Sequence, residues 1–132
     1  MSGRLARRVS SVAVLTCLAS ATATAAGDPR RGEKVFQKCY ACHSVEPGEV
    51  NLPGPNLAGI IGRAIAAEAG FDYSPALRDL ATREKVWTAD LLDRFVAAPE
   101  EVAPGTQMSF PGLAKAADRA DLLAYLGSAS DR

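Results

Sequence analysis

The sequence predicts an all-α protein in which four to five short helices are joined by long loops. Apolar residues recur at the three- and four-residue spacing of a helix in several short segments, and no segment alternates apolar and polar residues as a strand does. Prolines and glycines separate these segments, so each helix must be short. Apolar residues make up 48% of the 132 residues and charged residues 23%, which is typical of a globular chain with one core.

The first helix is predicted to begin at Pro29. Asp28 before it is a good N-cap, because its carboxylate can accept hydrogen bonds from the first free N–H groups, and proline suits the first helical position. Val35, Phe36 and Cys39 then follow on neighbouring positions of the helix surface. This helix therefore leads directly into the cysteine-containing segment.

Residues 44–73 are predicted to form a long loop, because prolines and glycines interrupt them repeatedly. A second helix is expected to start at Ser74 and to run through Leu80. Thr88 is the expected N-cap of a third helix, which Pro99 should stop. These loops and helices account for the middle of the chain.

The last helix is predicted near the C-terminus. Its inward face carries four large side chains, Leu122, Leu123, Tyr125 and Leu126. Gly127 follows them where a C′ glycine usually ends a helix, so the helix is expected to stop there.

The first 26 residues have the form of a secretory signal peptide, which leaves residues 27–132 as one globular domain. Three arginines precede an uncharged run, and Ala23-Thr24-Ala25 is a cleavage site of the Ala-x-Ala type. The sequence therefore predicts export to the bacterial periplasm. The alternative is an uncleaved membrane anchor, because the uncharged run of 18 residues approaches the spanning length of about 20 residues.

The charge and the rare residues of the exported part narrow its chemistry. Removal of three leader arginines leaves 12 basic and 15 acidic side chains, a net charge of −3. Nucleic acid is not an expected partner, because phosphate binding needs a basic face. His43 is the only histidine and Met108 the only methionine outside the leader, so any mechanism that needs two imidazoles fails.

The motif Cys39-Tyr40-Ala41-Cys42-His43 carries the chemistry of this sequence. A disulfide within it would close a very short loop and stabilise little, and a zinc site would lack a fourth ligand. A thiol redox motif would need a βαβ setting, whereas the flanking sequence is helical. The remaining interpretation is covalent attachment of haem, for which C-x-x-C-H is the signature.

The spacing gives each residue of the motif a role. Three-residue spacing on a helical turn places both sulfurs on one side, where they can bond to the two vinyl groups of a haem, and His43 then points at the iron. The long loop 44–73 could pack against the haem face. The expected cofactor is one haem c, attached through Cys39 and Cys42.

Met108 is predicted to be the second axial ligand of the iron. It lies 65 residues after His43, which is enough chain to pass around the ring, and it follows a Pro104-Gly105 turn in a loop. The alternative is that Met108 fills a gap in the core, as methionine often does. A gap-filling methionine would more usually stand in an apolar run at helical spacing.

With these residues in place, the chain from Gly27 to Gly127 resembles the class I cytochromes c, the mitochondrial proteins and their short bacterial relatives. The resemblance rests on Gly32, Phe36, Cys39 to His43, Gly54-Pro55-Asn56-Leu57, Gly62-Arg63, Phe71, Tyr73, Trp87, Pro104-Gly105-Thr106, Met108, Asp121-Leu122 and Tyr125-Leu126. It implies the cytochrome c fold, with short helices and long loops wrapped around one covalently bound haem.

The resemblance also implies roles for residues outside the motif. The carbonyl of Pro55 would accept the second N–H of His43, Gly32 would lie against the last helix, and Phe110 would cover the haem edge. The haem propionates would be held by Arg63, Tyr73, Trp87 and Thr106. The aromatic residues could also be plain core or rim side chains, and Arg63 could be solvated.

Three features depart from the mitochondrial pattern. Phe95 replaces a tyrosine whose hydroxyl reaches the methionine sulfur, so that hydrogen bond to Met108 should be missing. Gln107 replaces a lysine beside the ligand. The basic front face is reduced to Lys38 and Lys115, which predicts weaker electrostatic docking.

The predicted function is that of a monohaem c-type cytochrome, not an enzyme, which carries single electrons between redox protein partners as a periplasmic monomer. Two filled axial positions exclude substrate from the iron, and a His/Met pair raises the potential. One alternative is a dedicated subunit of a periplasmic dehydrogenase or sulfur-oxidising complex. Another is a haem enzyme or gas-binding protein with an open sixth position, although no second imidazole is available for acid–base work. Membrane contact is expected only through partners or an uncleaved anchor.

Overall fold

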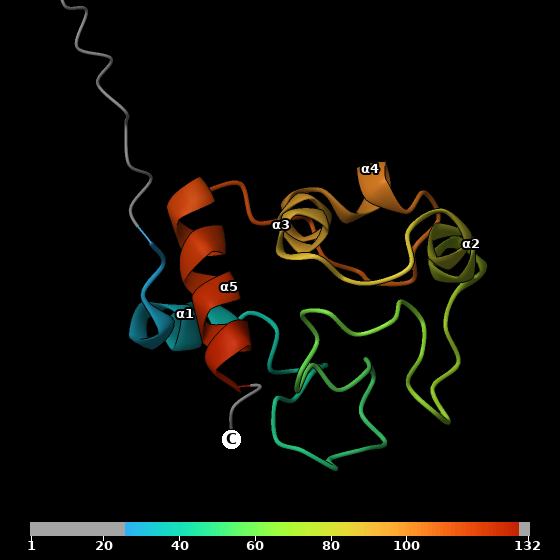
Figure 1. Cartoon of the computed structure of the whole chain (residues 1–132), viewed down its shortest axis with the longest axis horizontal. Helices are drawn as coiled ribbons and strands as arrows, with labels where there is room; N and C mark the ends of the chain where they lie inside the picture. Colours follow the sequence, from blue (N-terminus) through green and yellow to red (C-terminus); the bar gives the residue numbers. More distant parts are fainter. Residues whose placement is uncertain (1–25, 130–132) are drawn as a thin grey trace, which may run out of the picture.

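The structure is a computed structural model that describes residues 26–129, so almost all of the predicted leader 1–26 lies outside the described residues. Its helices are α1 (Pro29–Phe36), α2 (Pro75–Arg83), α3 (Ala89–Ala97), α4 (Pro99–Val102) and α5 (Ala116–Ala129) (Figure 1). The described residues form no strand, and their one isolated antiparallel bridge joins Ala64 to Val86. The predicted all-α architecture is confirmed.

The helices begin where the sequence predicts. The carboxylate of Asp28 accepts hydrogen bonds from the N–H groups of Arg30 and Arg31. The side-chain oxygens of Ser74 and Thr88 each accept one from the third residue that follows. Because the first N–H groups of a helix have no intrahelical partner, these caps fix the start of each helix locally.

Two helix ends differ from the expectation. Pro99 does end α3, but it also serves as the first residue of the one-turn helix α4, a position that proline favours. Gly127 was wrongly predicted as a C′ residue, because it lies inside α5, which continues to Ala129. Leu126 and Ala129 are both buried, so packing carries the helix past the glycine.

Helices α1 and α5 cross at a close contact, as Figure 1 shows. A Cβ atom on Gly32 would lie 1.9 Å from the carbonyl oxygen of Asp121 and 2.7 Å from Cβ of Tyr125. Only glycine lets the two backbones approach this closely. The predicted contact between Gly32 and the last helix is confirmed.

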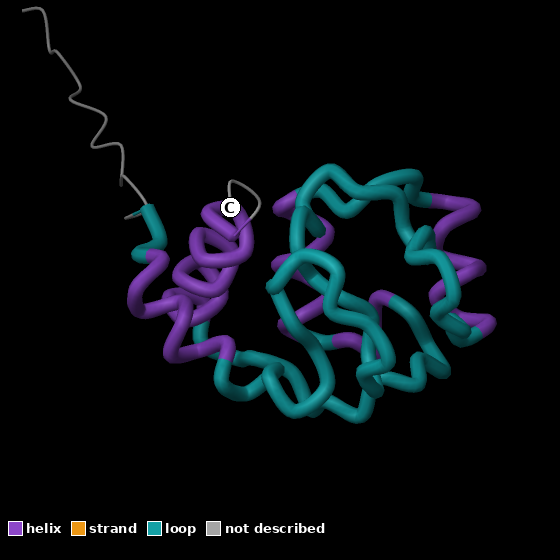
Figure 2. The backbone as a smooth tube through the Cα atoms, turned by 90° about the horizontal axis from the view of Figure 1, so that it is seen from below, coloured by secondary structure: helices purple, strands orange, loops and turns teal. Residues whose placement is uncertain are grey.

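The rest of the described chain surrounds an interior space. The core is apolar, with Leu80 of α2 and Leu91 of α3 fully buried. Figure 2 shows loops between α1 and α2 closing the ring of backbone opposite the α1–α5 pair. No helix within residues 26–129 is long and apolar enough to cross a membrane.

Candidate haem-binding site

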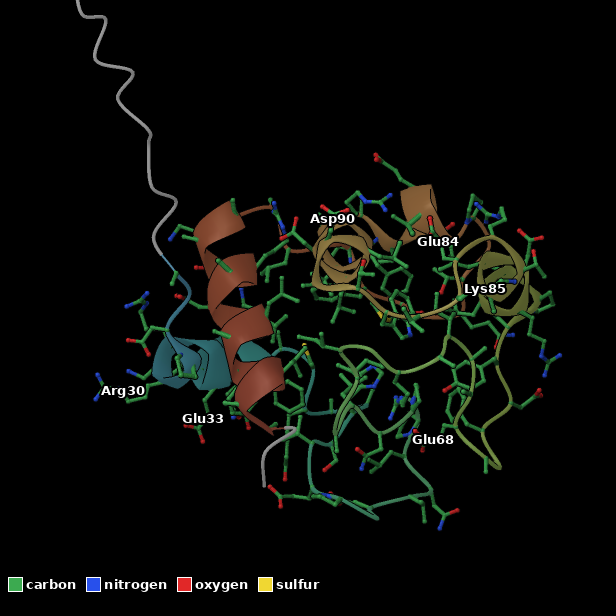
Figure 3. The ribbon with its side chains drawn as sticks, viewed as in Figure 1. Arg30, Glu33, Glu68, Glu84, Lys85 and Asp90 are labelled. Atoms are coloured by element: carbon green, nitrogen blue, oxygen red, sulfur yellow. The ribbon has the colours of Figure 1, made fainter. Side chains whose placement is uncertain are left out.

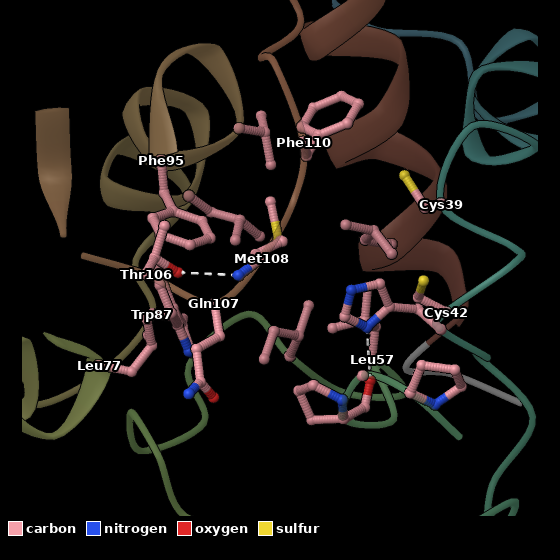
Figure 4. Close-up of a pocket in the computed structure, with 18 of the residues that line it drawn as sticks. Cys39, Cys42, Leu57, Leu77, Trp87, Phe95, Thr106, Gln107, Met108 and Phe110 are labelled. Atoms are coloured by element: carbon pink, nitrogen blue, oxygen red, sulfur yellow. Dashed lines mark hydrogen bonds between the residues drawn. The ribbon is translucent and has the colours of Figure 1, made fainter. Parts of the chain in front are cut away.

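A cavity of about 550 Å³ lies inside this ring, and all predicted site residues line it. That volume is in the usual range for a cofactor pocket. The predicted residues on its wall are Cys39, Cys42, His43, Pro55, Arg63, Tyr73, Trp87, Thr106 and Met108. Residues from distant parts of the chain therefore meet at one site (Figure 4).

The two cysteines stand in helical turns that continue from α1. The Cys39 N–H donates to the Phe36 carbonyl at 2.7 Å, and the N–H groups of Cys42 and His43 both donate to the Cys39 carbonyl at 3.0 Å. Both thiols are free, and burial raises the pKa of Cys39. No group of three or more His, Cys, Asp or Glu side chains within residues 26–129 is arranged to hold a metal ion.

His43 presents one ring nitrogen to the cavity because the other is already bonded. Its Nδ1 lies 2.7 Å from the carbonyl oxygen of Pro55. A carbonyl can only accept, so Nδ1 carries the proton and Nε2 keeps its lone pair. Burial lowers the pKa of His43, against the opposing effects of the Pro55 hydrogen bond and the charge of Glu68. The result is an oriented neutral imidazole, the form that binds metals.

A glycine makes room for this imidazole. A Cβ atom on Gly54 would lie 2.5 Å from Cε1 of His43. The same loop is tied to the motif by backbone bonds, from the Gly54 N–H to the Cys42 carbonyl at 2.8 Å and from the Leu57 N–H to the Ser44 carbonyl at 2.7 Å. The sequence marks Gly54 only as part of a motif, because its contact with His43 appears only in three dimensions.

Met108 lies in the loop between α4 and α5 and also faces the cavity (Figure 4). Its N–H donates to the Thr106 hydroxyl oxygen at 3.3 Å, and its carbonyl accepts from the Phe110 N–H at 2.8 Å. The Thr106 hydroxyl keeps its own proton, so it can still donate to a propionate. These bonds give the loop a defined shape around the sulfur-bearing side chain.

The residues expected at the propionates are fixed by further bonds. Arg63 Nη2 donates to the Asn56 carbonyl at 2.6 Å, so this guanidinium is not merely solvated. The Tyr73 hydroxyl oxygen accepts from the Glu68 N–H at 3.3 Å, and burial raises the pKa of Tyr73, which keeps it neutral. The Trp87 N–H donates to the Arg63 carbonyl at 2.9 Å.

Aromatic rings close one wall of the cavity. Trp87 and Phe95 are both buried, and their ring centroids lie 5.1 Å apart. Phe95 has no hydroxyl, so position 95 offers no hydrogen bond to the Met108 sulfur, as the sequence predicts. Phe110 also lines the cavity and is half-buried.

The groups around this cavity fit a haem c. Most of the wall is apolar, as the faces of a porphyrin require, and a few polar side chains can serve its carboxylates. A neutral imidazole and a thioether are the ligand pair that cytochromes c offer to iron. Two thiols at three-residue spacing stand beside the imidazole.

Comparison with known proteins agrees with this site. The cytochrome c family profile matches residues 29–130. Cytochrome c-550 of Ancylobacter novellus is 45% identical over 98 residues, which are 74% of this chain and 92% of the relative. Cytochrome c2 of Rhodoblastus acidophilus is 43% identical over 101 residues, 76% of this chain and 92% of the relative. Cytochrome c of Gossypium barbadense is 44% identical over 101 residues, 76% of this chain and 88% of the relative.

The chain belongs to the cytochrome c family. As a class I c-type cytochrome it has the predicted fold and carries one haem c, covalently attached through Cys39 and Cys42. It is a monohaem electron carrier. The predicted family, fold and cofactor are confirmed.

Proposed function

We propose that this cytochrome shuttles single electrons between larger redox proteins in the bacterial periplasm, with His43 and Met108 as the axial ligands of the haem iron. The observation that carries the proposal is that both side chains line one cavity although 65 residues separate them. When bound, the haem supplies one-electron exchange between Fe(II) and Fe(III).

The chain prepares both ligands before they meet the iron. Pro55 fixes the ring of His43 through Nδ1 and leaves Nε2 as the donor atom. The Thr106 hydroxyl and the Phe110 N–H hold the backbone of Met108 on both sides. With both axial positions filled by protein, substrate is excluded from the iron, and the protein acts as a carrier and not as an enzyme.

The walls of the cavity keep the cost of electron transfer small. Buried apolar side chains, among them Leu92, Phe95 and Leu122, exclude water from the ring. Less solvent then has to reorient when the iron changes its charge. Arg63, Tyr73, Trp87 and Thr106 would bind the propionates through hydrogen bonds and so fix the haem plane.

The location and partners follow from the ends and the surface of the chain. Residues 1–26 have the form of a cleaved signal peptide, and residues 27–132 would then act as a soluble monomer. Exposed Lys38 lines the cavity rim and marks where the haem edge meets a donor or acceptor protein. A permanently docked subunit of a dehydrogenase or sulfur-oxidising complex is the alternative, which co-purification of the native protein would reveal.

The test is carbon monoxide added to the reduced native protein. A six-coordinate carrier with both ligands in place leaves the spectrum unchanged near neutral pH. Rapid carbon monoxide binding would show an open sixth position and would replace the carrier by a gas-binding protein or a haem enzyme. Recovery of the haem protein from the periplasmic fraction of the native host tests the location separately.

A further inference from the structure

One buried acidic group beside the haem cavity has no role in the function proposed above. Oε2 of Glu68 is a buried carboxylate oxygen without a hydrogen-bond donor, the only such side-chain atom among residues 26–129. A buried polar atom without a partner is rare in folded proteins and costs free energy. Glu68 therefore calls for an explanation beyond local packing.

The neighbours of Glu68 connect it to the haem site. Its Oε2 lies 3.9 Å from Nη2 of Arg63, too far for a hydrogen bond but close enough for a strong charge interaction. Its backbone N–H donates to the Tyr73 hydroxyl. Arg63 and Tyr73 both line the cavity, whereas Glu68 does not, so the carboxylate stands behind the two residues.

Arg63 does not depend on Glu68 for its position. Its Nη2 and Nη1 donate to the carbonyls of Asn56 and Ala58, at 2.6 and 3.3 Å. Both side chains are mostly shielded from water, with 25% of Arg63 and 18% of Glu68 exposed. A charge interaction between shielded groups is weakly screened by salt. The carboxylate thus changes the charge beside the cavity without holding the cavity together.

The charge of Glu68 also reaches the imidazole that faces the iron. It acts to raise the pKa of His43, against the larger effect of burial. A negative charge that stabilises a positive imidazole likewise stabilises the extra positive charge of oxidised iron bound to that imidazole. The charged and titratable groups that face Glu68 are Arg63, Tyr73 and His43.

We propose that Glu68 sets the reduction potential of this cytochrome: its carboxylate, held behind Arg63, stabilises the oxidised over the reduced haem and so lowers the potential. Net charge near a haem and its burial are two of the means by which a protein tunes this potential. The proposal rests on the proposed function in one respect, which is that His43 ligates the iron.

The experiment is equilibrium redox titration of the holoprotein and of neutral variants at position 68. Glu68→Gln keeps the shape of the side chain and removes its charge. Glu68→Ala removes the charge without adding an amide that must find hydrogen-bond partners, and it serves if Glu68→Gln does not fold. The matched control is Glu33→Gln, an equal charge change on exposed α1, well away from Glu68 in Figure 3.

The expected result is an upward shift of the midpoint potential in both position-68 variants, several-fold larger than in Glu33→Gln and retained at high salt. Glu68→Asp, which keeps the charge, should stay close to the parent protein. An unchanged potential in Glu68→Gln or Glu68→Ala overturns the proposal. So does a shift that comes with loss of the sulfur-to-iron band of the oxidised protein, because Glu68 would then act through the coordination geometry. If the parent protein itself lacks that band, the His/Met ligation of the proposed function fails instead.

Discussion

Arg31 of α1 holds Asp121 of α5 with two parallel hydrogen bonds, from Nε to Oδ2 at 2.7 Å and from Nη2 to Oδ1 at 2.9 Å. The N–H of Asp28 donates to the same Oδ1 at 2.7 Å. A carboxylate that accepts three such bonds is strongly favoured in its charged form. The pair therefore locks the crossing of α1 and α5, which holds the cysteine-containing turn in place.

This pair predicts an acid-sensitive contribution to stability. The hydrogen bonds from Arg31 lower the pKa of Asp121 below its usual range. A lowered native pKa gives stability that is present above the unfolded pKa of about 3.9 and is lost as the pH falls through the lower native value. Asp121→Asn should therefore lower the melting temperature at pH 7, and the difference from the parent should shrink between pH 4 and pH 2, as about these values imply.

Thermal unfolding of the holoprotein across this pH range measures the effect. Glu33→Gln on the exposed face of α1 is the control and should change the melting temperature little at any pH. A penalty for Asp121→Asn that stays constant down to pH 2 would mean that shape, and not charge, is lost.

The local signals in the sequence were enough to predict the start of α1, α2 and α3. An N-cap acts within one helical turn, so Asp28, Ser74 and Thr88 could be interpreted without knowledge of the rest of the fold. The pairing of Arg31 with Asp121 could not, because 90 residues separate them and nothing local links the two.

The candidate site was predictable for a different reason. The motif at Cys39 to His43 and the single exported methionine leave few choices of haem ligand. What sequence reasoning missed are groups that act from behind the cavity wall, such as Glu68, or by having no side chain, such as Gly54. It also misjudged Gly127, because a glycine after an apolar helix face predicts a helix end unless packing continues beyond it.

The contact between Gly54 and His43 predicts a variant with a haem-site defect. In Gly54→Ala the new methyl group would lie 2.5 Å from the imidazole, so the ring must turn or the loop must move. Either change disturbs the bond between Nδ1 and the Pro55 carbonyl that orients the ring. We expect an altered spectrum and a lower stability, by about 1 to 3 kcal/mol.

Gly127→Ala is the matched control for this substitution. Its new methyl group would lie 3.9 Å from the nearest atom outside its own helix turn, Cδ1 of Ile61, which is an ordinary contact. Alanine is the better helix former, so Gly127→Ala should gain up to about 1 kcal/mol with an unchanged spectrum. Equal behaviour of the two variants in denaturant unfolding would show that Gly54 is not sterically constrained.

Folding is expected to depend on the haem. The cavity of about 550 Å³ lies within the described part of a small domain, and the core cannot close without filling it. A group that binds only the native state adds its binding energy to stability. Cys39→Ala with Cys42→Ala should therefore leave a largely unfolded chain by circular dichroism. A cooperative melt with native helix content would contradict this.

Docking should depend only mildly on ionic strength. Lys38 is exposed at the cavity rim, but Nζ of Lys115 lies 3.9 Å from a carboxylate oxygen of Asp118, which offsets part of its charge. With a net charge of −3 outside the leader, long-range attraction to acidic partners is weak. Rates of electron transfer with the native partner should fall only slightly as salt rises, and a steep fall in stopped-flow measurements would reveal a basic patch.

The ligation of iron by Met108 is the prediction on which carrier and enzyme part. Outside the leader there is no second histidine, both thiols are used in haem attachment, and Met108 is the only thioether. A lysine would first have to lose a proton from a group with an unperturbed pKa of about 10.4, which is unfavourable near neutrality. No other side chain of the exported part offers iron a soft sulfur ligand.

Met108→Ala should therefore remove the weak long-wavelength sulfur-to-iron band of the oxidised protein, lower the potential and let carbon monoxide bind the reduced iron. The haem should stay covalently attached, because Cys39 and Cys42 are unchanged. Gln107→Ala is the control beside it, since that exposed side chain can be removed without touching a ligand. If Met108→Ala kept both the band and the potential, Met108 would be a wall residue of the cavity, and the sixth position would be filled by another group or open to substrate.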